Sequence, residues 1–127
     1  MKKNTLLITA LLCFQCLDAG VISDLITYFG QGDTQHIAQY LNNNVELAIK
    51  NAENVFTRQQ TQNILADFFK KNQPVSFTIS HQGEREHQQF VIGNLATKQG
   101  NYRVYFLVKN NLIHQLRIEE SNDWQFR

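Results

Sequence analysis

The chain has 127 residues, of which 43% are hydrophobic, so it can build one hydrophobic core but not two. Twelve Lys and Arg side chains stand against eleven Asp and Glu side chains, and the formal net charge is +1. That balance gives no general attraction for nucleic acid, and the apolar content exceeds that of disordered chains. These totals predict one small globular domain without a polyanion partner.

The first nineteen residues have the layout of a secretory signal peptide. Lys2 and Lys3 form a basic start, and a mostly apolar stretch follows over 6–17. This stretch is shorter than the roughly 20 residues of a membrane span. Small residues near its end predict cleavage after Ala19, so the mature chain would begin at Gly20 and would have no membrane span. A buried N-terminal helix is the alternative, but the stretch lacks the polar face of such a helix.

Both cysteines, Cys13 and Cys16, lie inside the predicted signal peptide. The mature domain would therefore have no disulfide and no cysteine-bound metal. An exported domain without disulfides favours a bacterial periplasm or cell surface. A lipoprotein would need one cysteine as its first residue, and neither cysteine follows the small residue expected there. Soluble export is therefore preferred to a lipid anchor.

Apolar residues at i, i+3, i+4 and i+7 predict an amphipathic helix over 21–29, which Gly30 and Gly32 would end. Asp33 is placed to cap a second short helix, which we expect to end at the asparagines 42–44. The alternation that follows predicts one short strand over 45–50. We expect residues 51–56 to form a loop.

The third predicted helix has the clearest start, because Thr57 and Gln60 form a capping-box pattern. Pro74 prevents its continuation. Polar connections separate the strands predicted after it, and Asn110 and Asn111 tolerate the positive φ of a tight turn between the last two strands. The four predicted strands cover residues 75–82, 89–97, 102–109 and 112–120.

This order of elements, ααβαββββ, predicts an α+β fold in which the N-terminal helices pack on one face of a curved antiparallel sheet. The order resembles that of the cone-shaped nuclear-transport-factor-2-like (cystatin-like) fold. We expect residues 1–19 to be the signal peptide, 20–120 the single domain and 121–127 a C-terminal tail. Trp124 and Phe126 in this tail would cover an edge of the sheet or remain without fixed structure.

Three stretches narrow the resemblance to one family. FFKKNQP leads into FTISHQG within 68–83, IGNL and GNYRV lie within 92–104, and IHQLRIE covers 113–119. They resemble domain of unknown function 4783, a family of small exported Bacteroidetes proteins, over most of the mature chain. The resemblance implies the cone-shaped fold and export. Its motifs are structural and it supplies no established activity, so no catalytic residue is transferred.

Alternate residues of a strand share one face, which predicts the lining of a cavity inside the cone. His81 and His114 fall in register with apolar neighbours on the faces predicted to point toward the helices. Tyr40 and Tyr102 are the other polar groups expected there. Such residues would orient a small apolar ligand, since a histidine titrates near neutrality and a tyrosine combines an apolar ring with a hydroxyl. The alternative is that each histidine makes an ordinary hydrogen bond at the edge of the core.

The residues give little support to an enzyme or a metal protein. A proton-transfer enzyme would need a carboxylate in the cavity, and Asp67 lies one step off the apolar stripe of its helix. The four histidines lack a helical i, i+4 pair, a cysteine partner or an acidic cluster. We therefore predict no catalytic residue, no metal and no cofactor.

The opposite face of the predicted sheet carries Arg103, Tyr105, Leu107 and Arg117. These residue types are common at protein contacts. The resemblance to cone folds, which commonly dimerise through this face, implies a similar contact here. Cross-strand ion pairs with Glu46 or Glu119 are the alternative. The first functional hypothesis is thus a noncatalytic, exported module that binds a small apolar ligand. The second is an interaction or scaffold domain that forms a homodimer through the outer sheet face.

Overall fold

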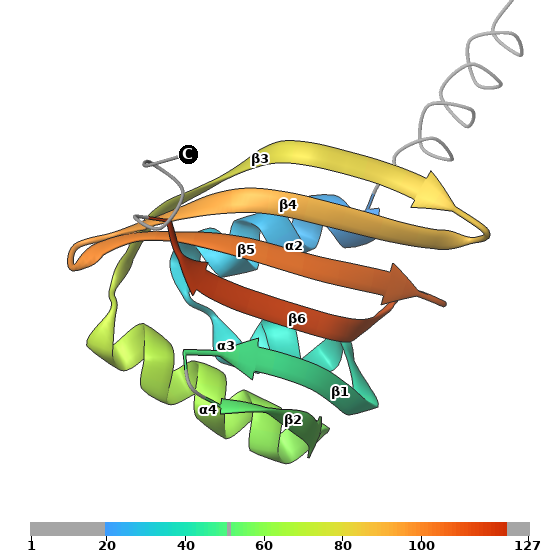
Figure 1. Cartoon of the computed structure of the whole chain (residues 1–127), viewed down its shortest axis with the longest axis horizontal. Coiled ribbons are helices and arrows are strands. Elements are labelled where there is room, and N and C mark those ends of the chain that lie inside the picture. The colour runs from blue at the N-terminus through green and yellow to red at the C-terminus, as the bar shows by residue number, and fades with distance from the viewer. Residues whose placement is uncertain (1–19, 51, 122–127) are drawn as a thin grey trace, which may run out of the picture.

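The computed structural model describes residues 20–50 and 52–121. The predicted signal peptide, its two cysteines and the tail residues Trp124 and Phe126 lie outside these ranges. Helices pack on one face of a curved sheet, which confirms the α+β class and the cone-like arrangement (Figure 1). The elements, in chain order, are α2 (Gly20–Gln31), α3 (Thr34–Gln39), β1 (Leu41–Ile49), β2 (Ala52–Thr57), α4 (Arg58–Lys71), β3 (Pro74–Arg85), β4 (Gln88–Thr97), β5 (Gly100–Lys109) and β6 (Leu112–Glu120).

The sheet has six strands in the order β2-β1-β6-β5-β4-β3. Neighbours pair antiparallel except β1 and β6, which pair parallel, so the sheet is mixed rather than purely antiparallel. In Figure 1 the three helices lie behind the sheet. We call the face toward the helices the inner face and the opposite one the outer face.

The two N-terminal helices follow the predicted signals with small shifts. Gly30 lies within α2, and Gly32, with a φ of 66°, follows its end. The Asp33 side chain accepts a hydrogen bond from the His36 backbone N–H, which confirms Asp33 as the N-cap of α3. This helix ends at Gln39, earlier than expected, because β1 begins at Leu41 and includes the asparagines 42–44.

Helix α4 begins as the sequence predicts. The Thr57 side chain accepts a hydrogen bond from the Gln60 N–H, and the Gln60 side chain accepts one from the Thr57 N–H. Both halves of the capping box are therefore present. At the other end, Asn72 caps α4 before Pro74 opens β3. The tight turn between β5 and β6 is also confirmed, with φ values of 54° at Asn110 and 64° at Asn111.

The predicted loop over 51–56 is wrong, because residues 52–57 form strand β2, which pairs antiparallel with β1. Most of its residues are exposed, among them Glu53, Asn54 and Val55. An exposed edge strand needs no apolar alternation, since pairing with its neighbour holds it. Its sequence consequently lacks the pattern by which strands are predicted.

Aromatic rings fill the space between the helices and the sheet. The Phe29 ring stacks on Phe106 with centroids 5.4 Å apart and meets Phe77 at 5.6 Å. On the β5 side, Phe68 contacts the Tyr102 ring edge to face at 4.9 Å. These five side chains are at most 7% exposed. The cone is therefore packed with side chains at its centre.

Candidate functional site

His81 does not point toward the helices, contrary to the expectation from simple alternation. Ile79 pairs with Gly93, but His81 pairs with Ile92, so Ser80 is an extra residue in β3. Such a bulge changes the face to which the following side chains point. His81 is consequently exposed beside Ile92 on the outer face.

A second irregularity displaces His114 from the inner face. Leu107 pairs with Gln115, whereas its neighbour Val108 pairs with Ile113, so His114 is the extra residue of β6. Ile113 is fully buried in its place. His114 is half-buried, and its Nε2 lies 3.2 Å from the Lys109 carbonyl oxygen, to which it can donate. The placement of His114 in a cavity is therefore wrong as well.

Tyr102 points toward the helices and is 5% exposed, but it fills the interior instead of lining a cavity. Its hydroxyl donates a hydrogen bond of 2.8 Å to Asn72 Oδ1. Burial raises the pKa of the Tyr102 hydroxyl, and the nearby Glu120 raises it further. The hydroxyl is thus a neutral, satisfied core group.

Tyr40 lies apart from Tyr102, at the junction of α2 and α3. Its hydroxyl donates to Asp24 Oδ2 at 2.8 Å, and this hydrogen bond is the main reason why the pKa of Tyr40 is raised. The Tyr28 ring stacks on His36 beside it, with centroids 4.8 Å apart. The four residues predicted to share a ligand pocket are therefore not brought together, and the predicted cavity between helices and sheet is occupied by aromatic rings.

The outer face presents side chains from all six strands in two neighbouring rows. Each row contains residues that are partners in the strand registers. The first row, from β2 to β3, is Glu53, Ala48, Arg117, Tyr105, Ile92 and His81. The second row is Val55, Glu46, Gln115, Leu107, Phe90 and Gly83.

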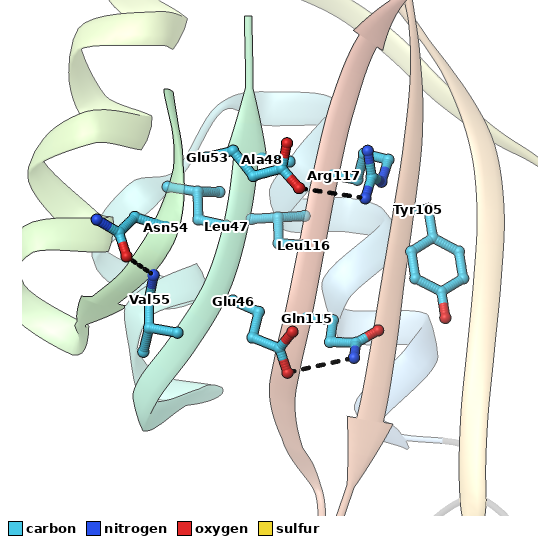
Figure 2. Close-up of a pocket in the computed structure, with 10 residues that line it drawn as sticks. All are labelled: Glu46, Leu47, Ala48, Glu53, Asn54, Val55, Tyr105, Gln115, Leu116 and Arg117. Atoms are coloured by element: carbon cyan, nitrogen blue, oxygen red, sulfur yellow. Dashed lines mark hydrogen bonds and ion pairs between the residues drawn. The ribbon is translucent and has the colours of Figure 1, made fainter. Parts of the chain in front are cut away.

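Two shallow hollows lie on this face and share Tyr105 and Arg117. The first hollow has a volume of about 280 Å³ and lies over β1, β2, β5 and β6 (Figure 2). The second hollow, of about 330 Å³, lies over β4, β5 and β6. The lining of the second hollow consists of Ile92, Arg103, Tyr105, Arg117 and Glu119. Because they share two lining residues, the two hollows are adjacent, and we refer to them together as the depression of the outer face.

Charged groups sit at the borders of this depression. Arg117 lies 3.4 Å from Glu119. Arg117 also lies 4.0 Å from Glu53, and Gln115 Nε2 donates to Glu46 Oε2 at 3.4 Å (Figure 2). Arg117 and Glu119 both lie on β6, so their pair is not one of the cross-strand ion pairs that the sequence raised as an alternative to an interface. These contacts are exposed, so water screens them and they contribute little to stability.

The predicted interface residues Arg103, Tyr105 and Leu107 are half-buried on the outer face, and Arg117 is exposed there. Sequence reasoning missed Glu53 and Val55 in the same surface, because they belong to the strand that had been expected to be a loop. A usable signal was the polar pair Lys50-Asn51 after the alternation of β1, which is compatible with a hairpin turn. Lys50 indeed has a φ of 51°.

The two edges of the sheet are less open to a partner than its outer face. In β2 the Val55 N–H donates to the neighbouring Asn54 side chain at 2.8 Å. Strand β3 starts with Pro74 and has register shifts at 74–76 and 79–81. Proline, bulges and occupied backbone donors hinder the addition of another strand.

Within residues 20–50 and 52–121, no helix is long and apolar enough to cross a membrane. No three His, Cys, Asp or Glu side chains in these ranges gather as metal ligands would.

Comparison with known proteins agrees with the fold. A family model described as "Domain of unknown function (DUF4783)" matches residues 22–119. Crystal structures of DUF4783 family proteins from Bacteroides ovatus and Bacteroides uniformis are 37% and 35% identical to the chain. Both superpose with a TM-score of 0.72 and cover 76% of this chain, and the matches span 91% and 93% of those chains.

A more distant structure supports the fold class alone. An NTF2-like protein of unknown function from Cytophaga hutchinsonii is 11% identical, with a TM-score of 0.60, and the match covers 84% of this chain and 92% of that one. No curated protein matches the chain.

Proposed function

The chain belongs to the DUF4783 family, and from this premise we propose that it is an exported, noncatalytic interaction module that associates with a second copy through its outer sheet face. One observation carries the proposal. The inner face is filled with aromatic side chains, whereas the outer face leaves apolar side chains partly exposed among acidic and basic groups. A small-ligand pocket inside the cone is not proposed, because aromatic rings pack against one another between the helices and the sheet, and the four candidate residues are not brought together there.

The apolar part of the outer face supplies the driving force. Val55 is 58% exposed, and Tyr105, Leu107, Phe90 and Ile92 are half-buried on the same face. Apolar and aromatic side chains gathered on one face are typical of protein contacts, whereas single exposed apolar residues are ordinary. A second copy would remove these side chains from water.

The charges favour a copy of the same chain as the partner. Glu46 lies on β1 and Glu53 on β2, while Arg103 lies on β5, which is two strands from β1 and three from β2. A twofold axis between these groups would place the acidic strands of one protomer over β5 of its partner. Each copy would then bring its glutamates toward the arginine of the other, and this complementarity would fix the orientation. Two sheets packed face to face commonly cross at about 30°.

Sedimentation velocity of the chain from Gly20, at concentrations up to about 100 µM, tests the proposal. The unmodified chain should form a dimer, and Arg103→Glu should shift it to monomer. Combining Arg103→Glu with Glu46→Arg should restore the dimer, because the complementary charges are exchanged. Lys70→Glu is the matched control, since this exposed side chain lies on α4, away from the outer face. A chain that stays monomeric throughout, or a dimer unaffected by Arg103→Glu, would refute the proposed interface.

A further inference from the structure

The second hollow is lined by two neighbouring rows of strand partners. In one row, Tyr105 pairs with Arg117 of β6 and with Ile92 of β4. In the next row, Arg103 of β5 pairs with Glu119 of β6. The hollow therefore takes its whole lining from three adjacent strands. Its volume of about 330 Å³ lies at the lower end of the range for small-ligand sites.

The two arginines bring hydrogen-bond donors to one place. Arg103 lies opposite Glu119, two residues beyond Arg117 on β6, so the two arginines are diagonal neighbours. Diagonal neighbours on one face of a sheet are about 7–8 Å apart, a gap that two long side chains can close onto one anion. Each guanidinium has five N–H donors, so an arginine that already has a partner still offers others. Paired donors of this kind suit the two oxygens of a carboxylate.

Glu119 adds the opposite charge to the same hollow. Its side chain is half-buried and lies 3.4 Å from Arg117. This carboxylate would repel a simple anion, whereas a ligand that carries an ammonium group beside its carboxylate would use it. In an α-amino acid a single carbon joins these two groups. Their close spacing corresponds to a hollow in which Arg103 and Glu119 are direct strand partners.

The remaining lining is apolar and lies on the other side of β5. Ile92 on β4 and the ring of Tyr105 are partners in one row, and both are half-buried. Glu119 lies on β6, so β5 separates the acidic side of the hollow from the apolar side. Aromatic rings pack well against tyrosine and against branched aliphatic side chains. An amino acid held by its charged groups would therefore direct an apolar side chain toward β4.

We propose that the second hollow is a binding site for a free α-amino acid with an apolar, aromatic side chain. Arg103 and Arg117 bind its carboxylate, Glu119 binds its ammonium group, and Ile92 and Tyr105 contact its side chain. This inference goes beyond the proposed function, because one copy of the chain forms the whole site. A second copy would compete with the amino acid for Arg103, so binding is measured at concentrations where the chain sediments as a monomer.

Titration of the ¹⁵N-labelled chain with L-phenylalanine tests the proposal, with amide chemical shifts of β4, β5 and β6 as the readout. The shifts should saturate. Two analogues each lack one charged group: 3-phenylpropanoate has no ammonium group, and phenethylamine has no carboxylate. Both should bind several-fold more weakly than phenylalanine. N-acetylphenylalanine represents the end of a peptide chain and should also bind several-fold more weakly, because its nitrogen carries no charge.

Substitutions assign the charged groups. Arg103→Gln should weaken the binding of phenylalanine and of 3-phenylpropanoate alike. Glu119→Gln should weaken the binding of phenylalanine but strengthen that of 3-phenylpropanoate, a reversal that a purely structural role of Glu119 would not produce. Arg85→Gln is the matched control, because it removes the same charge from an exposed arginine at the end of β3, outside the lining of the hollow. Circular dichroism identifies variants that fail to fold, and Arg117→Gln then replaces Arg103→Gln.

Three results would overturn the proposal. The first is the absence of saturating shifts in β4, β5 and β6. The second is binding of 3-phenylpropanoate or N-acetylphenylalanine as tight as that of phenylalanine, since the ammonium group would then have no role. The third is an effect of Arg103→Gln no larger than that of Arg85→Gln. Sedimentation of the unliganded chain reports dimer formation separately, so either proposal can fail while the other stands.

Discussion

The Tyr102 hydroxyl donates a hydrogen bond of 2.8 Å to Asn72 Oδ1, which joins β5 to the residue that caps α4. Asn72 Nδ2 in turn donates to the Phe68 carbonyl oxygen at 3.0 Å. Asn72 is 5% exposed and Tyr102 equally so. A buried chain of two hydrogen bonds thus connects the end of α4 to the inner face and gives these polar groups their partners.

Replacing Tyr102 by Phe tests the contribution of this buried chain. The ring packing remains, but Asn72 Oδ1 loses its donor and stays buried, so the free energy of unfolding should fall by about 1–3 kcal/mol. Urea denaturation of the two chains measures the difference. Tyr105→Phe removes the same atom from a half-buried ring on the outer face and should change it by less than about 0.5 kcal/mol. Equal effects of the two variants would contradict the assigned role of the Tyr102 hydroxyl.

Alkaline pH should destabilise the fold through Tyr40 and Tyr102. The pKa of each hydroxyl is raised in the folded chain above the ordinary value of 10.0. The folded state therefore holds these protons more tightly, and their contribution is complete below pH 10 and lost as pH rises through the folded pKa values. Unfolding free energy measured in steps above pH 9 should decline, and Tyr102→Phe together with Tyr40→Phe should flatten this decline. An equally steep decline in the double variant would exclude the two tyrosines as its cause.

Two glycines on adjacent parts of the β3–β4 hairpin should differ in their tolerance of alanine. A Cβ at Gly93 would lie 2.7 Å from the Thr78 backbone oxygen and would also strike the buried Phe77 ring. A Cβ at Gly83 would meet the Phe90 ring at 2.6 Å, but that ring is half-buried on the outer face and can turn away. Gly93→Ala should therefore cost about 1–3 kcal/mol, and Gly83→Ala about 0.5 kcal/mol or less. Thermal and urea unfolding compare the two, and a reversed order would contradict the packing described for Phe77.

The helix starts and the last hairpin could be predicted because their signals are local. Asp33 and Thr57 cap through hydrogen bonds to residues three positions away, and the Asn110-Asn111 turn depends on two adjacent φ angles. Such contacts are complete within a few residues. They do not depend on how distant strands pair.

The faces of His81 and His114 could not be predicted by the same means. One inserted residue, Ser80 in β3 or His114 itself in β6, shifts the alternation, and its position is set by pairing with β4 or β5. Up to the bulge, Phe77 and Ile79 alternate with Thr78 and Ser80, and no local signal in the sequence marks the extra residue. The sequence therefore predicts a candidate site on the inner face, whereas His81 faces outward and His114 lies in a bulge.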